Sequence, residues 1–116
     1  MKAYKRSTRV AQLIQEQVAK IFHDIRELNK GLVTVTQVKL TDDLQTCRIF
    51  YSVIGSEEDK KNAKTVLEEK QKFIRFQLAQ TVDLRRTPTI DFKYDDSSEK
   101  AAKVFEILEK IENEKK

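Results

Sequence analysis

The sequence has very little of what disulfides, zinc sites and phosphate loops are built from. Its 116 residues include one cysteine, Cys47, one histidine, His23, and two glycines. One cysteine excludes an intrachain disulfide, and one cysteine with one histidine cannot complete a zinc site. Two glycines cannot form a glycine-rich phosphate loop. We therefore expect no metal and no cofactor, and the lack of disulfides is typical of a reducing, cytoplasmic setting.

Long hydrophobic runs and catalytic constellations are lacking as well. The longest apolar runs span only a few residues, far fewer than a membrane span needs. The N-terminus is basic, but no apolar stretch follows it, so it does not resemble a signal peptide. His23 lies in a predicted helix with no serine or cysteine near it in sequence, and Cys47 alternates with core positions of a predicted strand. The sequence thus predicts neither membrane association nor an enzyme with a small-molecule substrate.

What the sequence does contain is enough apolar material for one core and a high density of charge. Hydrophobic residues make up 39% of the chain, charged residues make up 36%, and the net charge is +4. A chain of this length typically forms one domain, so we interpret 1–116 as a single domain. Nothing in the sequence calls for an oligomer, and we predict a monomer.

Hydrophobic periodicity predicts the order helix, strand, strand, helix, helix, strand, helix. The first helix covers about 7–28, with apolar residues at steps of three or four. Two alternating strands follow at about 33–40 and 47–53, joined by a polar turn as an antiparallel hairpin. The alternation of the first strand slips by one residue near Gln37, which indicates a β-bulge. A third alternating strand covers about 89–94.

The helical region between the second and third strands, about 57–82, is predicted to be interrupted. Ser56 and Asp59 have the spacing of a capping box at its start. Its apolar stripe lacks a member in the middle of the region. We therefore expect two helices, or one kinked helix, with a polar junction at Lys70-Gln71-Lys72. The second of these helices would begin near the end of the junction, and we place Phe73 in its apolar stripe.

The closing helix is predicted to pack on the rest of the domain. Asp96 can cap it, with Glu99 three residues further on. The pairs Asp42-Asp43 and Asp95-Asp96 flank turns or helix starts, so they are predicted to cap amides rather than hold a cation. Residues 112–116 are expected to fray. The inner face of the closing helix is expected to carry Ala101, Phe105, Leu108 and Ile111.

One three-stranded sheet with the helices on one face is the economical α+β arrangement.

The basic residues are segregated from the acidic ones along the chain. Acids concentrate at 57–59 and in the closing helix. Such segregation, with the free amides of a helix N-terminus nearby, suits binding to a phosphate backbone. Ordinary solvated lysines are the alternative from charge alone. Few aromatic residues flank the basic clusters, so base stacking is not evident. The clusters are Lys2, Lys5, Arg6 and Arg9 in the first helix region, Lys70, Lys72 and Arg75 at the junction, and Arg85 and Arg86 before the last strand.

Several segments of the chain follow a specific order and spacing. They are Arg9-Val10-Ala11, Val33-Thr34-Val35-Thr36 with Val38, Leu40-Thr41-Asp42-Asp43-Leu44, Ile49-Phe50-Tyr51-Ser52-Val53 with Gly55, Phe73-Ile74-Arg75 with Leu78-Ala79, Leu84-Arg85-Arg86-Thr87-Pro88, and Ile90, Phe92, Tyr94, Asp95 and Ser97. Over nearly the whole chain this pattern resembles the ribosome-binding factor A family. The resemblance implies a type II KH-like fold. In that family an interrupted helix, often Ala-x-Gly, replaces the usual loop between the two central helices. Here Lys70, Gln71 and Lys72 occupy those positions, so we expect a smoother bend or a short turn.

The resemblance also implies a partner. Members of this bacterial family associate with the free 30S small ribosomal subunit and contact its ribosomal RNA. They assist late maturation of the 5′ end region of 16S rRNA, support growth in the cold, and are released with the help of a maturation GTPase. We therefore predict an RNA-binding assembly factor without catalytic activity. A general KH-like RNA binder with no ribosomal role, or a protein-interaction module, are the alternatives. The predicted phosphate contacts are Arg9, Lys70, Lys72, Arg75, Arg85 and Arg86.

Overall fold

The computed structural model of the chain describes residues 6–28 and 32–114, and its elements follow the predicted order. The helices are α1 (Arg6–Asp24), the short 3₁₀ helix η1 (Arg26–Leu28), α2 (Glu57–Glu69), α3 (Gln71–Thr81) and α4 (Ser97–Glu114). The strands are β1 (Leu32–Leu40), β2 (Thr46–Ile54) and β3 (Thr89–Tyr94). The first predicted helix therefore divides into α1 and η1.

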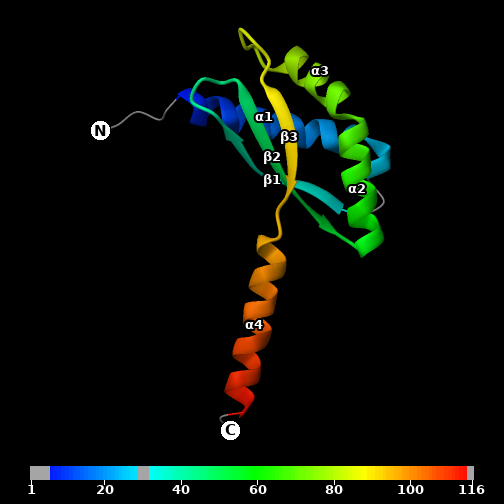
Figure 1. Cartoon of the computed structure of the whole chain (residues 1–116), viewed down its shortest axis with the longest axis vertical. Coiled ribbons are helices and arrows are strands. Elements are labelled where there is room, and N and C mark those ends of the chain that lie inside the picture. The colour runs from blue at the N-terminus through cyan, green and yellow to red at the C-terminus, as the bar shows by residue number, and fades with distance from the viewer. Residues whose placement is uncertain (1–5, 29–31, 115–116) are drawn as a thin grey trace, which may run out of the picture.

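The three strands form one mixed sheet with the order β1-β2-β3 (Figure 1). β1 and β2 pair as the predicted antiparallel hairpin, and β3 lies parallel to β2. A parallel pair needs a crossover connection, which α2 and α3 supply. The register of β1 shifts between Val35 and Gln37 and leaves Thr36 as the extra residue. The predicted bulge is confirmed, and it lets Val35 and Val38 both face the core.

The core lies between one face of this sheet and the three helices α1, α2 and α3. Alternate residues of β2 turn inward, so that Cys47 and Ile49 are fully buried while Arg48 between them is exposed. α1 crosses the sheet behind the hairpin, and α2 and α3 lie along one side (Figure 1). Side chains from every layer meet in this core and are essentially inaccessible: Ile14, Val18, Ile49, Leu67, Ile74 and Leu78.

The break between α2 and α3 falls inside the predicted junction. α2 starts with the predicted capping box, in which the Asp59 amide donates to Ser56 Oγ at 3.1 Å and the Ser56 amide donates to Asp59 Oδ2 at 2.9 Å. Lys70 separates the two helices, with φ −98° and ψ 9°. α3 resumes at Gln71, one residue earlier than expected, and the Gln71 side chain donates to the Ile90 carbonyl of β3. The junction is therefore a one-residue break, which matches the expected short turn.

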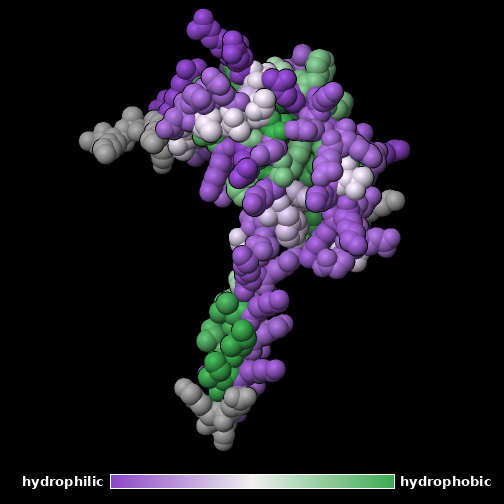
Figure 2. All heavy atoms as spheres, viewed as in Figure 1, coloured by the Kyte–Doolittle hydropathy of each residue, from purple (hydrophilic) through white to green (hydrophobic). Residues whose placement is uncertain are grey.

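The closing helix α4 contradicts the prediction that it packs on the domain. It projects away from the sheet and the other helices (Figure 1), and every α4 residue with a described side chain is exposed. Figure 2 shows its apolar residues gathered along one side of the projecting helix. The exposed fractions are 71% for Phe105, 54% for Leu108 and 44% for Ile111, and Ala101 is exposed too. The periodicity correctly predicted an amphipathic helix, but an apolar stripe does not say which surface covers it.

Polar contacts at the start of α4 fix the direction in which it leaves the sheet. Thr36, the bulge residue of β1, donates from Oγ1 to Asp95 Oδ2 at 2.7 Å. Lys60 of α2 forms an ion pair with Glu99 at 2.6 Å, and the Tyr94 hydroxyl donates to the same carboxylate. These contacts hold the first turn of α4 against β1 and α2, while the rest of the helix runs free of them.

The cap of α4 also differs from the predicted one. Asp95 accepts the Ser97 amide at 3.0 Å, whereas the Asp96 carboxylate forms an ion pair with Lys100 at 3.5 Å. The helix continues to Glu114, past the point where fraying was expected, and Lys115 and Lys116 lie outside the described residues. Across the described ranges, no helix combines the length and apolarity that crossing a membrane would require.

Candidate nucleic-acid interface

A basic hollow forms where three segments meet: the start of α1, the β1–β2 turn and the loop before β3. Its volume is about 390 Å³. Arg85 and Arg86, two of the predicted contacts, line it together with Arg6. All three arginines are exposed at their positions. We call Arg6, Arg9, Arg85 and Arg86 the arginine cluster, because Arg9 lies three residues after Arg6 on α1 and is a neighbour on the helix surface. Lys2 and Lys5 of the same sequence cluster lie outside the described residues.

Side-chain hydrogen bonds hold the walls of this hollow. Ser7, buried at the start of α1, donates to Asp42 Oδ1 at 3.2 Å and so ties the helix to the β1–β2 turn. Asp43 accepts from the Thr41 hydroxyl at 2.6 Å and from the Gln45 amide at 3.1 Å. These hydrogen bonds lower the pKa of the Asp43 carboxyl, so one negative charge sits among the arginines at neutral pH. The predicted amide-capping role of Asp43 is confirmed.

The junction lysines at the other end of α3 differ from each other. Lys70 is partly buried, pairs with Glu27 of η1 at 3.2 Å, and lies 5.7 Å from the centre of the Phe73 ring. Lys72 is exposed, and its side chain has no ion pair or hydrogen bond with the described part of the chain. Since Lys70 already has an acidic partner, Lys72 is the junction cation that is available to a ligand.

The Arg75 side chain is not free to bind a ligand, because it donates hydrogen bonds to the loop before β3. Its Nε donates to the Pro88 carbonyl at 2.9 Å, and its terminal nitrogen donates to the Thr87 carbonyl at 2.7 Å. The guanidinium thus clamps the loop that carries Arg85 and Arg86 onto α3. Five of the six predicted contacts therefore fall into two groups: Lys70 and Lys72 at the start of α3, and Arg9, Arg85 and Arg86 toward its end. The helix between the groups has 11 residues and is about 16 Å long. Arg75 lies between the two groups as a positioning residue.

Two aromatic side chains that the sequence reasoning missed lie on α3 next to these cations. Phe73, expected in the buried stripe, is 48% exposed, and Phe76 is 60% exposed. The expectation that few aromatic residues flank the basic clusters is therefore wrong. The exposure of Phe76 could have been predicted from its spacing. Ile74 and Leu78 define the buried face of α3, and a residue two positions after Ile74 points away from that face.

Comparison with known proteins assigns the chain to a family. The family model for ribosome-binding factor A matches residues 6–108. The chain belongs to the ribosome-binding factor A family. Ribosome-binding factor A from Trichlorobacter lovleyi is 38% identical over 109 residues, which cover 93% of this chain and 89% of the relative. Family membership confirms the resemblance seen in the sequence and makes the chain a non-catalytic factor, as predicted.

Structural comparison finds the same fold in other proteins. The crystal structure of ribosome-binding factor A from Thermus thermophilus is similar, with a TM-score of 0.65 and 21% identity, covering 76% of this chain and 94% of that one. A homology model of the Thermus thermophilus factor, fitted into a cryo-EM map of its complex with the 30S subunit, gives a TM-score of 0.66 and 24% identity, covering 80% and 98%. These likenesses confirm the type II KH-like fold. They do not test the predicted contact residues, which stay predictions.

Proposed function

We propose that this chain binds the free 30S subunit and assists late maturation of 16S rRNA in its 5′ end region. It does so in the cytoplasm, without a cofactor, and leaves with the help of a maturation GTPase. The observation that carries the proposal is membership in the ribosome-binding factor A family over residues 6–108. The factor of Thermus thermophilus, which shares the fold, has been fitted into a map of a 30S complex.

The arginine cluster supports binding through the RNA backbone. Guanidinium groups form paired hydrogen bonds with phosphate oxygens and keep their charge at every physiological pH. Three of the arginines converge on one hollow from two distant parts of the sequence. Contacts of this kind position a protein on RNA without reading its bases, which suits a factor that recognises one large folded particle.

Co-sedimentation with ribosomal particles at two salt concentrations tests the proposal. The wild-type protein should travel with free 30S subunits at low salt and be shed at high salt. The double reversal Arg85→Glu/Arg86→Glu should weaken binding and lower the salt dependence by about 0.7 to 0.9 in logarithmic slope for each lost phosphate contact. The matched control is Lys103→Glu/Lys110→Glu, which makes the same charge change on exposed positions of α4.

Each alternative gives a different outcome. Wild-type protein that stays at the top of the gradient at low salt would refute the ribosomal role. Equal competition by an unrelated structured RNA would indicate a general KH-like RNA binder. Binding that is insensitive to salt would indicate a protein interface, since release of counterions is what makes phosphate binding salt-dependent.

A further inference from the structure

The outward face of α3 combines exposed aromatic rings with positive charge and no negative charge. The helix sequence, QKFIRFQLAQT, contains two basic residues, two phenylalanines and no acid, whereas the preceding helix α2 contains five acids. A helix so depleted of acids has a field that repels cations and attracts phosphates. This composition sets α3 apart from α2 and makes it the first place to look for a ligand.

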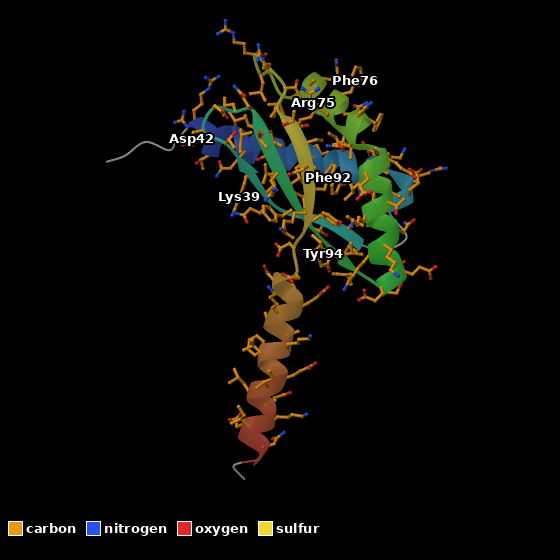
Figure 3. The ribbon with its side chains drawn as sticks, viewed as in Figure 1. Lys39, Asp42, Arg75, Phe76, Phe92 and Tyr94 are labelled. Atoms are coloured by element: carbon orange, nitrogen blue, oxygen red, sulfur yellow. The ribbon has the colours of Figure 1, made fainter. Side chains whose placement is uncertain are left out.

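The spacing of residues on α3 brings one lysine and two rings to the same side. Ile74 and Leu78 are fully buried and fix the inner face. Phe76 is two residues past Ile74, so it points outward, and Lys72 and Phe73 are four and three residues before it. Arg75 turns instead toward the loop before β3 (Figure 3). The outward face of α3 is thus a patch of three neighbouring side chains, Lys72, Phe73 and Phe76.

The lysines beside the two phenylalanine rings indicate which kind of ligand would cover the rings. Lys70 lies 5.7 Å from the centre of the Phe73 ring, and Lys72 is exposed with no partner in the described chain. An apolar protein surface would cover the rings but would leave Lys72 without a counter-charge. An unpaired nucleotide offers both a flat base and a phosphate within one unit. Neighbours at i and i+4 on a helix lie about 6 Å apart, which suits a base on Phe76 with its phosphate on Lys72.

We propose that this α3 patch stacks on unpaired bases of RNA, with Lys72 on the adjoining phosphate. The inference rests on the proposed function and adds to it a preference for one form of RNA. Because a duplex hides the faces of its bases, the patch selects single-stranded over double-stranded RNA. The arginine cluster supplies contacts that duplex and single strand share, and the α3 patch supplies the contact that distinguishes them.

Substitution of Phe76 tests the proposal in the full-length protein. The readouts are affinity for a labelled single-stranded oligonucleotide, for the duplex of the same sequence, and for 30S subunits. Phe76→Ala should weaken single-strand binding roughly 5- to 150-fold, the usual range for losing one stacked base, and leave duplex binding unchanged. The matched control is Phe105→Ala, which removes an exposed ring from α4 and should change neither affinity.

A tryptophan at position 76 would report base stacking directly, without a measurement of affinity. The chain contains no tryptophan. Phe76→Trp therefore introduces the only tryptophan, whose emission should be quenched by the single strand and not by the duplex. The thermal midpoints of the Phe76 variants should not fall markedly below the wild type, because Phe76 is 60% exposed and alanine is a better helix former than phenylalanine.

The outcomes separate this inference from the proposed function. Wild-type affinity of Phe76→Ala for single strands, with normal binding to 30S subunits, would overturn the inference alone. Loss of subunit binding without any change in oligonucleotide binding would assign the patch to a ribosomal protein and would also overturn it. Wild-type protein that discriminates between single strand and duplex but ignores 30S subunits would instead remove the proposed function.

Discussion

Removing the guanidinium of Arg75 should lower the stability of the fold as well as weaken RNA binding. Arg75 donates two hydrogen bonds, to the carbonyls of Pro88 and Thr87 at 2.9 and 2.7 Å. Hydrogen bonds from a charged donor contribute about 1.5 to 3 kcal/mol each when well shielded, but Arg75 is exposed and its carbonyl partners can be rehydrated. We therefore expect Arg75→Ala to lower the free energy of unfolding by about 1 to 2 kcal/mol.

Urea denaturation followed by circular dichroism measures this effect. For a domain of this size, the loss corresponds to a decrease of roughly 4 to 10 °C in the thermal midpoint. Arg75→Lys should rescue little of the stability, because a single ammonium cannot reproduce the two-pronged geometry of the guanidinium. Arg85→Ala is the control and should leave stability within about 0.5 kcal/mol of wild type. Wild-type stability of Arg75→Ala would refute the clamp and return Arg75 to the set of free phosphate contacts.

Three further predictions follow from the described contacts. Phe105→Ser on α4 should leave the free energy of unfolding unchanged in urea, whereas Leu78→Ala in the core should cost about 2 to 5 kcal/mol; equal losses would mean that α4 packs on the domain. The pKa of Glu99 is lowered chiefly by its hydrogen bond with Lys60, so its contribution to stability is present above the unfolded value of about 4.5 and is lost as the pH falls through the lower folded value. Glu99→Gln should remove that acid-sensitive component from a stability profile between pH 7 and 3, and an unchanged profile would contradict the ion pair. Burial raises the pKa of the Cys47 thiol to about 12, so a thiol reagent at pH 8 should modify it only after unfolding in urea, and rapid labelling of the native protein would disprove its burial.

Local patterns were sufficient to predict most of the fold. The bulge at Thr36, the capping box of Ser56 and Asp59, and the break at Lys70 each follow from residues that are neighbours in sequence. Periodicity and capping depend on such neighbours, so they can be recognised without a structure. The direction of α4 depends on contacts between Lys60 and Glu99 and between Thr36 and Asp95, which lie far apart along the chain. No local pattern encodes those pairs, and the packing of α4 was accordingly predicted wrongly.

The candidate site was likewise predictable from the sequence only in part. The sequence identifies Arg6 and the pair Arg85 and Arg86 as members of two separate basic clusters, but only the fold brings them into one hollow. Charge counting also treated Lys70 and Arg75 as equal to Lys72. The structure gives Lys70 an acidic partner and uses Arg75 as a clamp, because a cation's availability depends on its neighbours in space. The sequence pattern places Phe73 in the buried stripe, because an aromatic residue in a helix is ordinarily counted toward the core, and makes no prediction for Phe76.

The freedom of α4 has a consequence for how the chain responds to temperature. A helix of 18 residues whose described side chains are all exposed draws little stability from packing, and its helical population falls steadily on heating. Its helix–coil equilibrium is therefore separate from the cooperative unfolding of the sheet and α1–α3. Fully helical, the segment is a stiff arm of about 27 Å. As a flexible coil it has a mean end-to-end distance of roughly 25 Å. Warming therefore replaces a stiff arm of fixed direction by a flexible segment of similar mean reach that samples many directions.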